Sequence, residues 1–251
     1  MKTPNQLRIT DFLMPFLIVF VFAMMQFVCY WATQNIILSS LLSGLVSVML
    51  LAQPVGPIRV KAAFRPKGLP LPLAVLGLGA GIINIAATDL LGELTQLPGS
   101  PSFAFVQLLG NPLTWLTIGL VGPVCEELLF REGIQGGLTR KGISPVWAIM
   151  MGSLLFSAAH ANPAQSLAAI CSGVVLGALY HRTQNVLLCG LVHIINNVLG
   201  LLQLALSKSV TIGTPLLDAL GSRPLSWTIM VVLYTCVGLM LWRLFAYHAR
   251  D

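Results

Sequence analysis

Three of the eight acidic residues of this chain lie close together in the stretch 122–133, GPVCEELLFREG. With one basic neighbour they form a charged group beside an apolar run of membrane-spanning length: Glu126, Glu127, Glu132 and Arg131. A charged side chain at membrane depth costs roughly 2.5–3.5 kcal/mol on insertion scales, so it rarely occurs there without a partner or a function. The stretch therefore indicates a functional site within a membrane. The alternative is that these charges close a helix end at the membrane surface.

Helical geometry separates the two adjacent glutamates. At about 100° per residue, Glu127 and Arg131 lie on one face with the glutamate first, which is the favourable order for an ion pair. Glu126 points about 100° away from Glu127, so Arg131 cannot neutralise both carboxylates equally. We therefore expect a structural ion pair between Glu127 and Arg131. Glu126 is the less compensated carboxylate, and it is suited to accept a proton in catalysis.

Two further motifs interrupt later apolar segments at helical spacing. Phe156 and His160 stand four residues apart in FSAAH. His193 and Asn197 stand four residues apart in HIINN. Each histidine alone is at least as often a packing residue as a catalytic one. Together with Glu126, however, these groups can activate a water and hold an oxyanion. Because no serine or cysteine stands at a recognisable spacing from a base, water is the expected nucleophile.

The same groups could instead bind a metal. A glutamate and two histidines, here Glu126, His160 and His193, can hold zinc with a water in the fourth position. The sequence has no HExxH motif, and the three residues lie on three separate apolar segments. We expect neither a metal nor another cofactor. A metal-dependent membrane peptidase that uses the same residues is the alternative.

The order of the three motifs resembles a known family. E-E-x-x-x-R, F-x-x-x-H and H-x-x-x-N follow one another on successive expected helices. This order is similar to that of the CAAX prenyl proteases and bacteriocin-processing proteins, the CPBP or Abi family of intramembrane glutamic endopeptidases. The resemblance covers about residues 113–206, which would be the catalytic core. It implies an intramembrane endopeptidase built from about eight helices.

The resemblance also implies a role for each motif residue. The first glutamate of the pair, Glu126, would take a proton from the water, and His160 would help to activate that water. His193 and Asn197 would form the oxyanion hole. The remaining two motif residues would form a structural ion pair: Glu127 and Arg131.

The substrate that the resemblance implies is a peptide or a membrane protein in the lipid bilayer. Eukaryotic members of the family remove the last three residues of prenylated CAAX proteins. Bacterial members are linked to peptide maturation, bacteriocin immunity or regulated cleavage of membrane proteins, and the short loops of this chain do not distinguish these substrates. From a different functional class, a non-catalytic membrane protein that serves binding or immunity is the alternative.

Composition determines the kind of scaffold that must position these residues. The 251-residue chain is 56% hydrophobic and only 9% charged, whereas a soluble domain carries about 25% charged residues. Apolar runs near 20 residues form membrane helices rather than barrel strands. We expect an all-α, polytopic membrane helix bundle that forms a single domain, residues 1–251. The net charge of +6 comes from basic residues in short loops, so no nucleic-acid partner is expected.

Eight apolar runs predict eight transmembrane helices, over residues 12–31, 36–52, 71–91, 113–131, 146–161, 164–180, 186–206 and 225–246. No small-residue cleavage site follows the first run, so it is expected to be a retained helix rather than a signal peptide. The acidic motif falls at the far end of the fourth run. A glycine-containing loop is expected after it, over residues 136–142.

The basic residues predict the orientation of the bundle. With a cytoplasmic N-terminus and eight alternating spans, the opposite side holds only Lys208 and Arg223. The cytoplasmic side holds the other twelve: Lys2, Arg8, Arg59, Lys61, Arg65, Lys67, Arg131, Arg140, Lys141, Arg182, Arg243 and Arg250. This bias predicts a multi-pass cell-membrane protein with both termini in the cytoplasm, and the compact length favours a bacterial source. A simple count puts His160 near the far surface, so we expect the fifth helix to begin deep or to tilt strongly.

Overall fold

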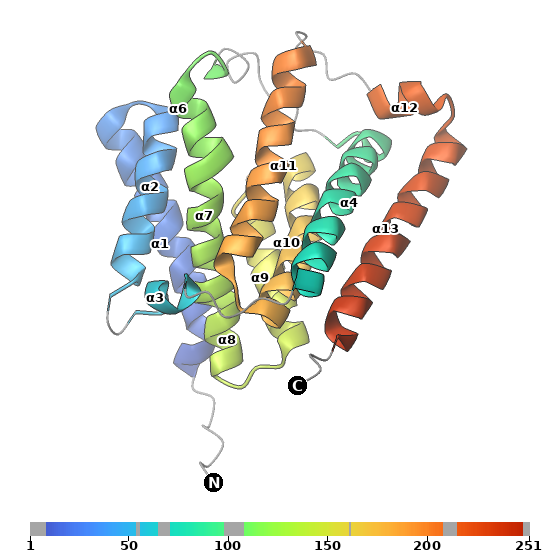
Figure 1. Cartoon of the computed structure of the whole chain (residues 1–251). Coiled ribbons are helices and arrows are strands. Elements are labelled where there is room, and N and C mark those ends of the chain that lie inside the picture. Colours follow the sequence, from blue (N-terminus) through green and yellow to red (C-terminus); the bar gives the residue numbers. More distant parts are fainter. Residues whose placement is uncertain are drawn as a thin grey trace.

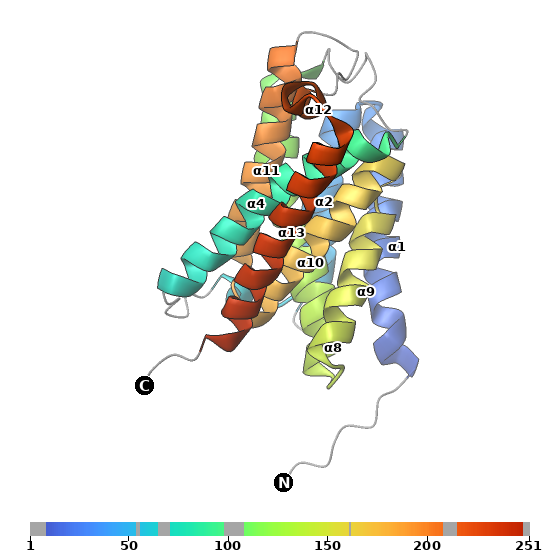
Figure 2. The ribbon, with the colours of Figure 1, turned by 90° about the vertical axis from the view of Figure 1, so that its right-hand side faces the viewer.

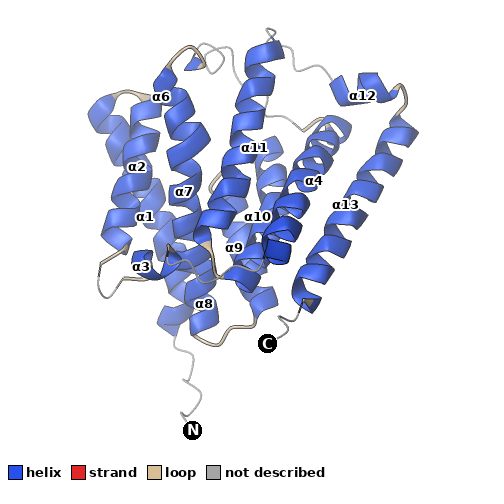
Figure 3. Cartoon of the chain, in the orientation of Figure 1, coloured by secondary structure: helices blue, strands red, loops and turns tan. Residues whose placement is uncertain are grey.

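The structure is a computed structural model of the chain, and it describes residues 9–53, 56–64, 71–97, 108–160, 162–207 and 215–247. Every regular element within these ranges is a helix (Figure 3). The predicted all-α class is therefore confirmed for the described part of the chain.

The helices form one series along the chain. In order they are α1 (Ile9–Thr33), α2 (Ile36–Leu51), α3 (Val60–Ala63), α4 (Leu71–Thr95), α6 (Pro112–Thr114), η1 (Trp115–Val121), α7 (Gly122–Glu127), η2 (Leu128–Gln135), α8 (Gly136–Arg140), α9 (Pro145–Ala158), α10 (Pro163–Thr183), α11 (Val186–Ser207), α12 (Pro215–Leu220) and α13 (Arg223–Ala246). Among the described residues, six helices are long and apolar enough to cross a membrane: α1, α4, the continuous run Pro112–Arg140, α10, α11 and α13. The helices α2 and α9 are apolar but shorter. The chain is thus a multi-pass membrane protein. Six of the eight predicted spans coincide with these long helices, and the other two coincide with the shorter helices α2 and α9.

The bundle is built around a central antiparallel pair, formed by α11 and the run from η1 to α8 (Figures 1 and 2). The run from η1 to α8 lies beside α11 in the middle, with α1 and α2 on one side and α4 and α13 on the other. The helices α9 and α10 pack against each other and complete the bundle. α1 begins and α13 ends at the same end of the bundle, the lower end in Figure 1, whereas α6 and α12 lie at the opposite end.

Short polar residues begin several of the helices. The side chain of Asn35 accepts hydrogen bonds from the first backbone N–H groups of α2, and Asn162 does the same for α10. Asn111 caps α6, and proline follows both Asn111 and Asn162 at the first helical position. A proline there loses no hydrogen bond, because the first N–H groups of a helix have no internal partner. These caps fix where the chain turns between neighbouring helices.

The helix that carries the acidic motif is longer than predicted. The prediction ended it near residue 131, but it continues to Arg140, so the expected loop from Gly136 is wrong. Gly136 does not break the helix; it leaves room for its neighbours. A Cβ at this position would lie 2.8 Å from both the guanidinium of Arg140 and the hydroxyl of Tyr180. The turn comes later, at Gly142, whose φ of +90° favours glycine.

Two parts of this helix, η1 and η2, are π-helical. The N–H of Gly122 donates to the carbonyl of Thr117, and the N–H of Gly136 donates to the carbonyl of Arg131, each five residues back. A Cβ at Gly122 would lie 2.6 Å from the carbonyl oxygen of Thr117, so the wide turn requires glycine there. π-Helical turns are rare and occur often at functional sites. In this chain they flank α7, which ends on the two glutamates.

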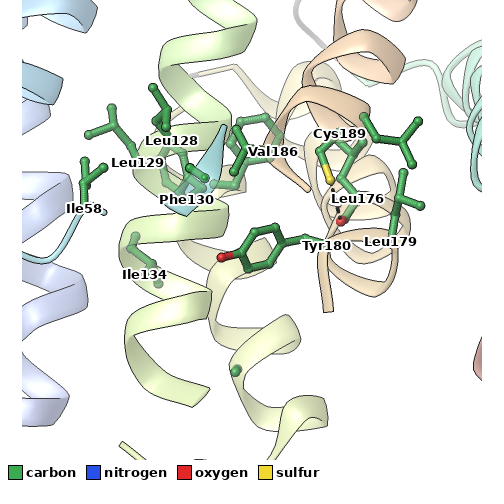
Figure 4. Close-up of a cluster of buried hydrophobic side chains, with 14 of the residues drawn as sticks. Ile58, Leu128, Leu129, Phe130, Ile134, Leu176, Leu179, Tyr180, Val186 and Cys189 are labelled. Atoms are coloured by element: carbon green, nitrogen blue, oxygen red, sulfur yellow. Dashed lines mark hydrogen bonds between the residues drawn. The ribbon is translucent and has the colours of Figure 1, made fainter. Parts of the chain in front are cut away.

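An apolar core lies where η2 meets α10 and α11 (Figure 4). Leu129, Phe130 and Ile134 of η2 are almost completely buried, and Tyr180 and Cys189 pack in the same cluster. The thiol of Cys189 donates to the carbonyl of Leu176 and has no disulfide partner. This core holds the helix of the acidic motif firmly against the two helices that follow it in the bundle.

Candidate active site

The ion pair of the acidic motif is completely buried. Nε of Arg131 lies 2.9 Å from Oε2 of Glu127, and both side chains are 0% exposed. The expectation that this pair lies at the end of its helix is wrong, because the helix continues beyond it to Arg140. Within the described residues, Nη1 and Nη2 of Arg131 have no hydrogen-bond partner.

His193 of α11 lies between the two glutamates of α7. Its Nδ1 is 3.1 Å from Oε1 of Glu127, and its Nε2 is 3.7 Å from Oε2 of Glu126. A carboxylate only accepts hydrogen bonds, so Nδ1 of His193 carries a proton and donates it to Glu127. This bond fixes the imidazole with Nε2 toward Glu126.

The two glutamates differ in exposure as well as in partners. Glu127 accepts from both Arg131 and His193 and is fully buried. The side chain of Glu126 is 24% exposed. Glu126 is therefore the carboxylate of the pair that a bound water or substrate can reach.

Asn197 lies one turn beyond His193 on α11. Its Nδ2 donates to the backbone carbonyl of Ile118 in η1 at 2.8 Å, and its Oδ1 accepts from Nδ2 of Asn196 at 3.1 Å. An amide nitrogen carries two hydrogens. One N–H of Asn197 is thus engaged and holds the amide in place, and no described residue uses the other.

Phe156 connects the second motif to the other two. Its buried ring lies edge-on to His160 and to His193, with centroid distances of 4.9 Å and 5.7 Å. The ring of Phe130 lies 5.0 Å away, and Cζ of Arg131 lies 5.1 Å from the centroid of Phe156. The phenylalanine of the F-x-x-x-H motif therefore packs against both histidines and against the cation that neutralises Glu127.

His160 lies just beyond the end of α9. Its Nδ1 is 2.8 Å from the carbonyl of Phe156, and because a carbonyl only accepts, Nδ1 is the donor and Nε2 of the neutral ring is an acceptor. The hydroxyl of Ser166 donates to the carbonyl of His160 and fixes the turn into α10. Of the contacts in the described part of the chain, none joins His160 directly to Glu126. Both histidines contact the ring of Phe156, and His193 in turn lies 3.7 Å from Glu126.

The short length of α9 bears on the depth of His160. This helix has 14 residues, which corresponds to about 21 Å, less than the roughly 30 Å of a bilayer core. Figure 2 shows α9 ending well below the upper end of α11. α9, which ends two residues before His160, therefore stops short of the upper end of the bundle.

One cluster near the site was not predicted from the sequence. Glu132 is nearly buried; Arg140 donates to its Oε1 at 2.7 Å, and the hydroxyl of Tyr180 donates to its Oε2. Arg140 also donates to the carbonyl of Pro57 at 2.9 Å and so ties the segment before α3 to the bundle. The pairing could be found from the sequence only by extending the helix through Gly136, because residues 136–142 were expected to form a loop.

Several residues of the site are of types that bind metals. Among the residues that the structure describes, no group of three or more His, Cys, Asp or Glu side chains is arranged to hold a metal ion. Glu126 and His193 are neighbours, whereas no contact in the described part of the chain joins His160 directly to Glu126. The three candidate ligands therefore do not converge as the ligands of a zinc site would.

Comparison with known proteins finds one family to which the segment around the site is similar. Residues 108–199 match the family described as type II CAAX prenyl endopeptidase Rce1-like. Comparison with curated proteins and with solved structures finds no match. The matched segment contains all three motifs, from Glu126 to Asn197. Residues 108–199 are therefore similar to the type II CAAX prenyl endopeptidase Rce1-like family, which agrees with the resemblance of the motifs to the CAAX protease and CPBP proteins.

Proposed function

We propose that this chain is an intramembrane peptidase that hydrolyses a peptide bond with a water activated by Glu126 and His160. The observation that carries the proposal is the position of His193 between a partly exposed glutamate and a buried one. An imidazole held in this way stands beside a carboxylate that can take a proton. The family match supports peptide hydrolysis as the reaction.

In the proposed reaction, Glu126 removes a proton from a water whose orientation Nε2 of His160 supports. The water oxygen bonds to the carbonyl carbon of the substrate, and the carbonyl oxygen becomes an oxyanion. The C–N bond then breaks, and the proton held by Glu126 passes to the leaving amine. General acid–base steps of this kind typically contribute about 10²–10⁴-fold to the rate.

The oxyanion would be held by α11. The unused N–H of Asn197 and Nε2 of His193, when that nitrogen is protonated, supply donors one turn apart on one face. Preorganised donors stabilise the charge that develops in the transition state without reorganising. Glu127 and Arg131 would not touch the substrate; their buried ion pair would hold His193 in position.

The membrane arrangement that fits the bundle has eight spans, with both termini in the cytoplasm of a bacterial cell. At about 1.5 Å per residue, α2 and α9 are about 24 Å and 21 Å long, and both pack within the bundle. The end where α1 begins carries most of the described loop and helix-end cations: Arg59, Lys61, Arg140, Lys141, Arg182 and Arg243. Arg223 begins α13 at the other end. The remaining predicted loop cations lie outside the described residues: Lys2, Arg8, Arg65, Lys67, Lys208 and Arg250.

The substrate class follows from the family match. A type II CAAX prenyl endopeptidase acts on a prenylated C-terminal peptide, and we propose a peptide or membrane protein of that kind as the substrate. A bilayer-embedded site suits such a substrate, because a prenyl chain already partitions into lipid.

The test is cleavage of a quenched fluorescent peptide, ending in a farnesylated CAAX sequence, by the purified full-length chain in proteoliposomes. The wild type should cleave it, and Glu126→Gln and Glu126→Ala should not, while all remain folded and inserted. Asp89→Asn is the matched control, because it removes another carboxylate from an apolar helix, α4, outside the site. Equal rates for Glu126→Ala and the wild type would refute the mechanism. Binding of the peptide without cleavage by the wild type would favour a non-catalytic protein.

A further inference from the structure

We infer that Pro123 is a positioning residue for Asn197. By withholding a backbone N–H, Pro123 leaves the carbonyl of Ile118 free to hold the side-chain amide of Asn197. The contact itself is independent of the proposed function, and only its catalytic consequence rests on that function.

Backbone hydrogen bonds at the end of η1 join residues five positions apart. The N–H of Gly122 donates to the carbonyl of Thr117, five residues back. If this register continued, the carbonyl of Ile118 would accept from the nitrogen of residue 123. That residue is a proline, which has no N–H. The carbonyl of Ile118 thus loses its partner in the helix.

An unpaired carbonyl inside a membrane bundle is costly, because no lipid group can donate to it. The structure supplies the missing donor from another helix: Nδ2 of Asn197 lies 2.8 Å from the carbonyl oxygen of Ile118. The two helices are in contact at this level, where Gly119 faces α11. A Cβ at Gly119 would lie 3.4 Å from Val198 and 3.5 Å from Leu201, in van der Waals contact.

Gly122 is the second part of the same device. A Cβ there would lie 2.6 Å from the carbonyl oxygen of Thr117, so the wide turn forms only with glycine. Gly122 permits the five-residue register, and Pro123 prevents its next hydrogen bond. The two residues also begin α7, which carries Glu126 and Glu127. One change of hydrogen-bond register, at Gly122 and Pro123, therefore positions the glutamates and provides the acceptor for the amide of Asn197.

The bond to the carbonyl of Ile118 helps to set the direction of the second N–H of Asn197. With one N–H bonded to Ile118 and Oδ1 bonded to Asn196, the amide plane is fixed at two points. Without the free carbonyl, the amide can rotate, and its remaining N–H loses its fixed direction. Preorganisation of this kind is what gives an oxyanion donor its effect.

The inference is tested first without any assay of activity. The full-length chain is labelled with ¹⁵N-asparagine in detergent micelles, and the side-chain signal of Asn197 is identified by its loss in Asn197→Asp. In the wild type, one of the two amide protons should exchange with solvent about tenfold more slowly than the other. In Pro123→Ala the difference should disappear, because the new N–H can occupy the carbonyl of Ile118. Pro145→Ala is the control, since this proline lies at the first position of α9, where an added N–H has no carbonyl to bind.

The kinetic arm uses the farnesylated peptide. Pro123→Ala should lower kcat about tenfold or more with KM within about twofold of the wild type. Adding Pro123→Ala to Asn197→Ala should cause little further loss, because both changes act through one amide. Equal exchange of the two Asn197 protons in the wild type, or an unchanged difference in Pro123→Ala, would overturn the inference whether or not the peptide is cleaved. An absence of wild-type cleavage would count against the proposed function alone, because the exchange measurement still decides the contact.

Discussion

His193 is bonded more closely to Glu127 than to Glu126: Nδ1 lies 3.1 Å from the buried glutamate, whereas Nε2 lies 3.7 Å from the partly exposed one. Glu127 also accepts from Arg131, so a single carboxylate joins the ion pair of its own helix to the imidazole of another. Glu127 therefore helps to hold α11 in place, in addition to balancing the charge of Arg131.

Glu127→Gln tests this relationship. The amide keeps the size of the side chain but removes the charge beside Arg131 and weakens the acceptor of His193. We expect both a loss of thermal stability and a fall in kcat, since the imidazole is no longer fixed. Glu126→Gln is the paired variant, and it should lose activity while it keeps its melting temperature. Melting in detergent together with peptide cleavage checks the prediction; a Glu127→Gln protein with wild-type stability and kcat would contradict it.

Arg131→Ala should destabilise the protein strongly. It leaves the fully buried Glu127 without its cation and removes the guanidinium from the face of Phe156. Breaking a buried pair by removing one partner costs roughly 3–5 kcal/mol. Solvent does not screen this pair and so does not lower the cost, because both side chains are 0% exposed.

The control for Arg131→Ala is Lys141→Ala. Lys141 pairs with Asp11 at 2.9 Å, but its side chain is 51% exposed, and exposed pairs contribute about 0–1 kcal/mol. Thermal unfolding in one detergent compares the two variants directly. Similar melting temperatures for both would argue against a stabilising role of the buried pair.

Asn197→Ala should act on turnover rather than on binding. Removal of one oxyanion donor typically costs about 10²–10³ in kcat, and an interaction made only in the transition state leaves ground-state binding little changed. Initial rates across a range of peptide concentrations separate kcat from KM. Asn196→Ala is the neighbouring control and should cost less, because it removes only the bond to Oδ1 of Asn197. A raised KM with unchanged kcat in Asn197→Ala would assign the residue to substrate binding instead.

The purified protein should contain no stoichiometric zinc, since the described His, Cys, Asp and Glu side chains form no group able to hold a metal. Elemental analysis of the wild type and of His160→Ala measures this, with activity recorded before and after chelation. One zinc per chain, lost together with activity in His160→Ala, would favour the metal-dependent alternative.

Local geometry made several features predictable from the sequence alone. The all-α class follows from apolar runs of about 20 residues, because a spanning segment must satisfy its own backbone hydrogen bonds. The approach of Glu127 to Arg131 follows from a separation of four residues, which one helical turn brings together wherever the helix lies. The same rule anticipated that His193 and Asn197 share a face of their helix.

Relations between helices were decided only by the tertiary structure. No local rule indicates that His193 turns to Glu127, that Phe156 stands between two histidines, or that Asn197 finds the carbonyl of Ile118. The length of the motif helix also depended on packing. From the sequence alone Gly136 indicates a turn, but in the structure it lies inside the helix and leaves room for Tyr180. Helical periodicity fixes the angle between side chains on one helix, but it contains no term for the distance or rotation between two helices, and these are set by the packing of the whole bundle.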